Sequence, residues 1–161
     1  VYRELYQKHL TAEELAAKIL EAEQLDPLPH YTVLDSSCWN KTGFGPSIAE
    51  VMMREGVRWT PADRNRIQGK REIHRRLADD PYTEEPRLRF FSSCQNIIKQ
   101  IAGIPLSKTN SEDVDTKAED HAYDALRYGM MTRMSGYASI HKQLGAIKNQ
   151  FHQVQDEVFG Y

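Results

Sequence analysis

The clearest structural signal in the chain is the run Asp120-His121-Ala122-Tyr123-Asp124-Ala125-Leu126-Arg127-Tyr128. Its small and apolar residues recur at helical spacing, and we predict a helix over 119–133 that lies close on a sheet. Residues three or four apart share one face of a helix, which aligns His121, Asp124 and Tyr128 and puts Asp120 beside them. The histidine and the carboxylate are therefore expected at the border of the buried face.

The two carboxylates of this run have different interpretations. Asp120 is either part of a cluster that caps the helix N-terminus, where acids suit the helix dipole, or a ligand. Asp124 lies too far inside the predicted helix for capping to explain it. A partly buried carboxylate needs a cation, a basic partner or a proton, so we expect Asp124 to have one of these.

Upstream of this run, strand-like and helix-like segments alternate. We predict strands over 1–6, 31–34, 57–60 and 87–91, and helices over 11–23, 48–54, 70–77 and 94–102. Strands separated by helices of this length imply crossover connections, so we expect an α/β fold with a largely parallel sheet. Asp35 follows the second strand, where open α/β sheets place their active crevice; alternatively, it only starts a turn.

Composition and charge narrow the class of protein. The 161 residues suit one domain, and 40% hydrophobic and 27% charged residues are ordinary for a soluble globular protein. A formal net charge of -2 excludes a uniformly basic nucleic-acid binder, so any DNA contact must come from a local patch. Cys38 and Cys94 have no CxxC partner, which argues against a zinc knuckle or a disulfide framework and fits a reducing cytosol. No apolar run is long enough for a membrane span.

A local basic patch lies between positions 64 and 76. Against one acid, Glu72, it holds Arg64, Arg66, Lys70, Arg71, Arg75 and Arg76. Such a cluster either supplies the counter-charge that duplex DNA needs in a groove or is a solvated helix face. Lys41, shortly after Asp35, is either a further contact to a substrate backbone or part of an exposed loop.

The C-terminal region carries a separate pattern over 140–158. Its apolar residues recur at spacings of four and three, typical of a heptad seam: Ile140, Leu144, Ile147, Phe151, Val154 and Val158. We therefore distinguish an amphipathic tail over 135–161 from a domain over 1–134. The seam either packs on its own domain or docks on a partner or a second subunit.

Several of these segments together carry a family resemblance. The run from Asp120 to Tyr128 resembles the last catalytic motif of the nuclease domain of phage terminase large subunits, a member of the RNase H-like superfamily. Val33-Leu34-Asp35-Ser36-Ser37 resembles the second acidic motif of that family, and Gly45-Pro46-Ser47-Ile48-Ala49-Glu50 resembles the helix after it. The ordered match covers 1–134 and implies an RNase H-like mixed sheet flanked by helices.

The resemblance implies a metal-dependent endonuclease that cuts concatemeric double-stranded DNA during genome packaging. By position, Asp35 and Asp124 would be catalytic metal ligands, His121 an accessory ligand or orienting residue, and Asp120 a further candidate ligand. Hydrolysis by two metal ions needs carboxylates that hold two divalent cations, here Mg²⁺ or Mn²⁺. The family's first acid lies on a strand that precedes the matched segments, so we expect this chain to bind metal weakly and cleave poorly.

The same resemblance implies partners and a setting. The partners would be double-stranded DNA, the portal protein and the small terminase subunit, and the setting would be the host cytoplasm. Residues 140–158 are a candidate surface for self-association. The chain has no Walker A loop, so ATP would bind to an upstream domain. Two alternatives stay open: another RNase H-like nuclease of the resolvase or transposase type, and a catalytically silent interaction module on the same fold.

Overall fold

The computed structural model describes residues 1–27, 29–41, 43–110, 112–115 and 118–132. The chain divides into two units, Val1–Met131 and Thr132–Tyr161. The labelled helices and strands all lie in the first unit. The predicted amphipathic segment over 140–158 lies outside the described residues.

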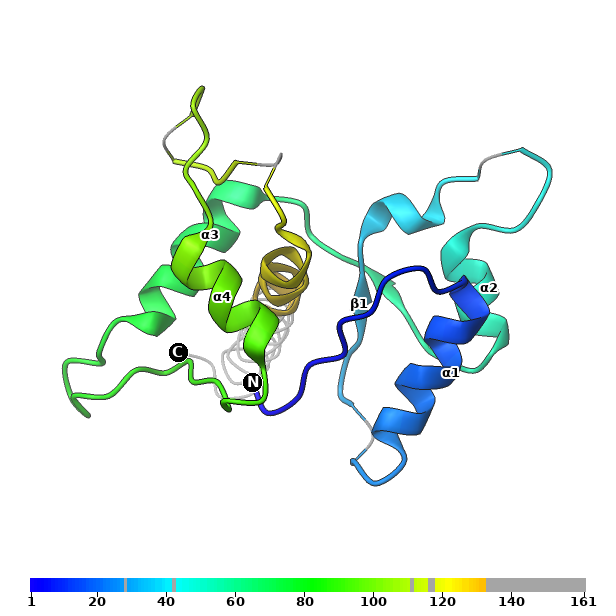
Figure 1. Ribbon diagram of the computed structural model, residues 1–161, viewed down its shortest axis with the longest axis horizontal. Helices are drawn as coiled ribbons and strands as arrows, with labels where there is room; N and C mark the ends of the chain where they lie inside the picture. The colour runs from blue at the N-terminus through cyan, green and yellow to red at the C-terminus, as the bar shows by residue number, and fades with distance from the viewer. Residues whose placement is uncertain (28, 42, 111, 116–117, 133–161) are drawn as a thin grey trace, which may run out of the picture. The chain divides into compact units, whose positions relative to one another are not determined.

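Two helices near the N-terminus begin at capping boxes. α1 spans Ala12–Glu23, and the Thr11 hydroxyl accepts the backbone N–H of Glu14 while the Glu14 carboxylate accepts that of Thr11. The same reciprocal pair precedes α2, Ile48–Arg54. The two helices pack on each other (Figure 1) around a small core of Ala16, Met52 and Val57. Both predicted helices are confirmed.

The sheet of the described residues consists of two short parallel strands. β1 spans Val33–Leu34 and β2 spans Thr60–Pro61, with Val33 beside Thr60 and Leu34 beside Pro61. The chain crosses from one to the other through α2, so the α/β class and the parallel pairing agree with the prediction.

The larger mixed sheet that the sequence predicts is not present among the described residues. Residues 1–6 and 87–91 form no strand, and their backbones meet where the N–H of Phe91 donates to the carbonyl of Val1 at 3.0 Å. Alternation around Leu88 suggested a strand, but Leu88 and the partly buried Phe90 pack against a helical core, and the N–H of Leu88 donates to the carbonyl of Arg76. The strand predictions at these two places are therefore wrong.

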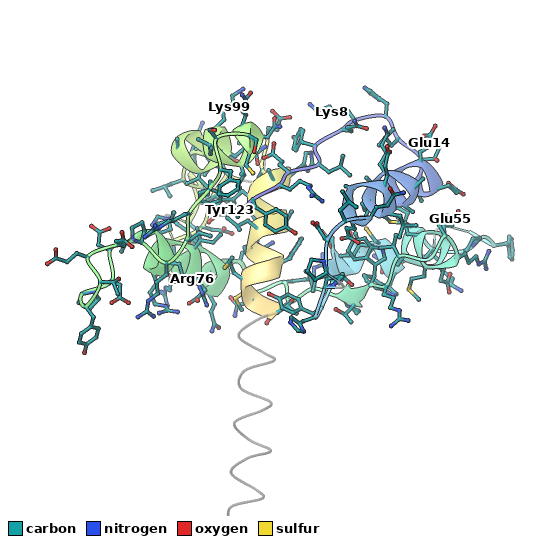
Figure 2. The ribbon with its side chains drawn as sticks, turned by 90° about the horizontal axis from the view of Figure 1, so that it is seen from below. Lys8, Glu14, Glu55, Arg76, Lys99 and Tyr123 are labelled. Atoms are coloured by element: carbon teal, nitrogen blue, oxygen red, sulfur yellow. The ribbon has the colours of Figure 1, made fainter. Side chains whose placement is uncertain are left out.

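Three helices surround a second core. α3 spans Arg66–Leu77, α4 spans Gln95–Gly103, and a further helix runs over 121–132, which includes Tyr123 (Figure 2). The buried residues of this core are Ile73, Leu88, Cys94, Ile97, Val114 and Tyr123. Gly69 lets α3 approach the 121–132 helix, because a Cβ at this position would lie 2.3 Å from Cγ of Arg127. Only glycine fits this crossing as it stands.

Two of these helices are capped by side chains from other segments. The side chain of the N-cap residue Cys94 makes no capping hydrogen bond to α4; instead the Glu4 carboxylate accepts the backbone N–H groups of Asn96 at 3.0 Å and Ile97 at 2.7 Å. Gln100 of α4 is buried, and its Oε1 accepts two backbone N–H groups at the start of the 121–132 helix, at 2.9 and 3.0 Å. The N-terminal segment, α4 and the 121–132 helix therefore hold one another in place.

Candidate functional site

Asp35 stands at the carboxyl end of β1 and caps the short 3-10 helix η1, Ser36–Trp39. Its Oδ1 accepts the backbone N–H of Ser37 at 2.8 Å, and its Oδ2 accepts the phenolic hydrogen of Tyr128 at 2.8 Å. Burial acts to raise the pKa of Asp35, but hydrogen bonds to the charged form outweigh it and lower the pKa. Asp35 therefore starts a turn and also contacts the 121–132 helix.

Tyr128 connects Asp35 to the helix that carries Asp124. It is buried, and the guanidinium carbon of Arg127 lies 4.5 Å from the centre of its ring. Burial, followed by the hydrogen bond to Asp35, raises the pKa of Tyr128 to about 12, and the charge of Asp124 adds to the shift. The phenol therefore stays protonated at neutral pH. Asp35 therefore accepts the hydrogen of this hydroxyl group, and the charge of Asp124 contributes to its raised pKa.

Asp124 is held by two arginines. Nε of Arg127, on the same helix, donates to Oδ1 at 3.0 Å, and Nη1 of Arg66, at the start of α3, donates to Oδ2 at 3.3 Å. The Arg127 side chain is 2% exposed, whereas that of Arg66 is 26% exposed. Asp124 thus has the basic partners that a half-buried carboxylate requires.

Arg66 contacts two further carboxylates. Its Nε lies 3.1 Å from Oδ2 of Asp113, and its Nη2 lies 3.6 Å from Oδ2 of Asp120. Within the described part of the chain, Nη2 of Arg66 and Nη1 of Arg127 are buried and have no hydrogen-bond partner. The cluster therefore sets three formal negative charges against two positive ones, and some of its donors are unsatisfied.

The other two predicted ligands, His121 and Asp120, lie in different surroundings. His121 is exposed, so the prediction that it borders the buried face is wrong, and it lines a cavity of about 710 Å³ with Val1 and residues 3–9. No hydrogen bond or ion pair joins it to Asp35 or Asp124 in the described residues. Asp120 takes the capping position, because its carbonyl accepts the N–H of Asp124 at 2.8 Å. Its side chain belongs to the Arg66 cluster.

The oxygens of Asp35 and Asp124 suit a divalent cation such as Mg²⁺ or Mn²⁺. These ions prefer oxygen ligands, and the four carboxylate oxygens carry more acceptor sites than the hydrogen bonds from the protein use. The described residues contain no group of three or more His, Cys, Asp or Glu side chains arranged to hold a metal. An ion held by these carboxylates would therefore need water or further ligands to complete its shell.

No match to the chain was found among protein-family models, curated proteins or solved structures. The terminase resemblance therefore rests on the residues of the motifs themselves. None of the described helices has the length and apolar character needed to cross a membrane.

The basic residues of α3 that we predicted to contact DNA pair with acids. Glu72 is buried and accepts from Arg75 at 2.8 Å and from Arg76, labelled in Figure 2, at 2.5 Å. The hydrogen bond from Arg75 is the main reason that the pKa of Glu72 is lowered. Arg71 pairs with Glu112 at 2.8 Å. The positive charge available to a duplex is therefore smaller than a count of basic residues indicates.

Arg64, Lys41 and Lys70 complete the predicted DNA-contacting set. Lys41 pairs with Glu50 at 3.1 Å, and Lys70 is half-buried and already takes part in an interaction within the protein. Arg64 is exposed, and its charge contributes to the lowered pKa of Asp35. Of the three, Arg64 is therefore the best placed to meet a substrate at the candidate site.

Sequence reasoning missed two roles in this site. Asp113 lies outside the helices and strands that the sequence predicts, and it shares the guanidinium of Arg66 with Asp124. Arg66 was assigned to DNA, whereas in the structure its partners are carboxylates of its own chain. The sequence feature that could have indicated these pairs is the excess of basic residues on α3. It implies that acids lie nearby, but it does not identify them.

Proposed function

We propose that this chain is the nuclease domain of a terminase-type DNA-packaging enzyme, with an RNase H-like fold that cuts double-stranded DNA with the help of divalent metal ions. One relationship supports the proposal above all. Tyr128 in the last motif donates a hydrogen bond to Asp35 in the second acidic motif at 2.8 Å. The two motifs are distant in sequence, and such proximity is what a shared metal centre needs.

In this function, Asp35 and Asp124 hold Mg²⁺ or Mn²⁺, which when bound supplies an activated water and charge stabilisation at the leaving oxygen. Tyr128 fixes the direction of the Asp35 carboxylate, and Arg127 fixes that of Asp124. The lowered pKa of Asp35 keeps this carboxylate ionised at neutral pH. His121 and Asp120 are weaker candidates for ligands, because the first is exposed and the second caps its helix.

The substrate and partners belong to the same proposal. Exposed basic residues, Arg64 first among them, would contact the phosphates of the duplex. The portal protein, the small terminase subunit, an ATPase domain encoded upstream and assembly in the host cytoplasm are supported by the motif resemblance alone.

One observation favours a second candidate function, a catalytically silent interaction module. Both oxygens of Asp124 already accept hydrogen bonds from guanidinium groups, those of Arg127 and Arg66. A carboxylate that is neutralised inside the protein needs no metal. In this case the same cluster serves only to hold α3 against the 121–132 helix.

Calorimetric titration with Mn²⁺ distinguishes the two candidates. The nuclease proposal predicts binding to the wild type that Asp35→Asn and Asp124→Asn each weaken by more than the roughly tenfold typical of losing a supporting residue. Asp79→Asn is the matched control, because Asp79 is an exposed carboxylate outside the cluster. An unchanged Mn²⁺ affinity in both site variants would show that Asp35 and Asp124 are not metal ligands. A wild type that binds no Mn²⁺ would favour the silent module.

A further inference from the structure

Arg66 differs from the other basic residues of the described chain in the number of acids with which it forms ion pairs. Its guanidinium contacts Asp113 at 3.1 Å, Asp124 at 3.3 Å and Asp120 at 3.6 Å. The other arginines of α3 with partners named above each pair with one acid. The Arg66 guanidinium contacts three carboxylates at once, so it occupies the position and carries the positive charge that a bound cation would have.

The position of Arg66 in its own helix does not explain this arrangement. Arg66 is the first residue of α3, and a cation in the first turn of a helix is disfavoured by the helix dipole. Burial acts to lower the pKa of Arg66, and the charges of Asp124 and Asp113 outweigh it and raise the pKa. The carboxylates, and not the helix, therefore hold the guanidinium where it is.

Arg127 also contacts Asp124, but its side chain is held more firmly than that of Arg66. It lies on the same helix as Asp124, is 2% exposed, and packs its side chain over Gly69. Arg66 reaches the cluster from another helix, is 26% exposed, and makes a contact of only 3.6 Å with Asp120. Of the two guanidinium groups, that of Arg66 is the one that can leave the cluster without unpacking a helix.

We propose that Arg66 is a built-in counter-cation of this acidic site, which a divalent metal ion has to displace from Asp124 in order to bind. The inference rests on the proposed function, because it needs Asp124 to be a metal ligand. Arg66 is then a positioning residue that stabilises the metal-free protein and lowers the affinity for metal. By linkage, whatever free energy Arg66 contributes to the metal-free cluster is subtracted from metal binding.

The test measures Mn²⁺ affinity by calorimetry and the thermal midpoint with and without Mn²⁺. Arg66→Gln should bind Mn²⁺ roughly tenfold to a hundredfold more tightly than the wild type, as expected for a coupling of ordinary size. Its midpoint should be lower without metal and should rise more on saturation, since a ligand stabilises a protein according to its affinity. Arg76→Gln removes the same charge from the same helix but leaves the Asp124 cluster intact, so its Mn²⁺ affinity and the rise of its midpoint on saturation should match those of the wild type.

The possible outcomes separate this inference from the proposed function. Equal Mn²⁺ affinity in the wild type and Arg66→Gln, or an equal gain in Arg76→Gln, overturns the role of Arg66 and leaves the nuclease proposal standing. Absence of binding in all three proteins overturns both. If circular dichroism shows that Arg66→Gln is unfolded, Arg66→Lys takes its place. Lysine keeps the charge but cannot bridge three carboxylates, so it should still bind Mn²⁺ more tightly than the wild type, and an unchanged affinity again overturns the inference.

Discussion

The phenolic hydroxyl of Tyr128 donates to Oδ2 of Asp35 at 2.8 Å, across 93 positions of sequence. This bond joins the carboxyl end of β1 to the 121–132 helix, two elements that carry the two acids of the candidate site. A hydrogen bond to a charged group is among the stronger ones in proteins, and this one is partly buried. The geometry of the site depends on it.

Tyr128→Phe should destabilise the protein at neutral pH by about 1.5 to 3 kcal/mol, because it removes a hydrogen bond to a charged group and leaves Asp35 with one partner fewer. Denaturant unfolding measures the effect. Tyr82→Phe is the control, since Tyr82 is 91% exposed and should change stability very little. An equally small effect of both substitutions would mean that the Tyr128–Asp35 bond adds nothing to the fold.

The effect of Tyr128→Phe should also depend on pH. The pKa of Asp35 is lowered in the folded protein, so its stabilising contribution is present above the unfolded pKa and is lost as pH falls through the folded pKa. Removing one hydrogen bond to the carboxylate raises that folded pKa toward the unfolded value, so the variant has less of this stabilisation to lose, and the difference in stability between the two proteins should shrink as pH falls. A difference in stability between the two proteins that stays constant from neutral to acid pH would contradict this linkage.

At high pH, two buried tyrosines should destabilise the fold as they ionise. The pKa values of Tyr123 and Tyr128 are each raised from 10.0 to about 12, in both cases mainly by burial. The protons are therefore bound more tightly in the folded state, and stability should be full below pH 10 and fall as pH rises through about 12. Ultraviolet titration of the native protein should show two phenols that ionise after the rest. Their ionisation together with the exposed tyrosines would show that they are not buried as described.

Gly69→Ala should destabilise the protein, although alanine is ordinarily favoured over glycine inside a helix by about 1 kcal/mol. The new Cβ would lie 2.3 Å from Cγ and 2.8 Å from Cδ of Arg127, and overpacking of this kind costs about 1 to 3 kcal/mol. Gly129→Ala is the matched control on the 121–132 helix, because a Cβ there meets nothing within 4 Å among the described residues. Thermal unfolding should rank Gly129→Ala above the wild type and Gly69→Ala below it; the reverse order would refute the close crossing at Gly69.

Glu4→Ala should loosen the start of α4, because the Glu4 carboxylate accepts the N–H groups of Asn96 and Ile97. Loss of a helix cap costs about 1 kcal/mol. Hydrogen exchange should become faster at these two amides, whereas Glu21→Ala, an exposed change on α1, should leave them unaffected. Identical exchange in both variants would show that Glu4 does not cap α4.

The elements that could be predicted from sequence are those fixed by neighbouring residues. Thr11 and Glu14 specify the start of α1 within four positions, and a like pair specifies the start of α2. Helical periodicity predicts that Asp124 and Tyr128 share one face of the helix. In the structure the charge of Asp124 contributes to the raised pKa of Tyr128. Local chemistry was sufficient in each case.

What could not be predicted depends on contacts between distant segments. The run 87–91 alternates like a strand, and Leu88 and Phe90 do pack against the core, but that core is built from helices rather than from a sheet. Arg66 meets Asp113 and Asp124 across 47 and 58 positions, and nothing in the local sequence selects these acids from the others in the chain. The acids of the candidate site could therefore be predicted from the sequence, but the arginines that pair with them could not.

Nicking of supercoiled plasmid in the presence of Mn²⁺ tests the central claim most directly, with the full product of the gene as the enzyme. The wild type and the control Asp79→Asn should nick the plasmid, and Asp35→Asn and Asp124→Asn should not, because each removes a charged ligand from the metal centre while circular dichroism shows an intact fold. Full nicking activity in Asp35→Asn and Asp124→Asn would contradict the account.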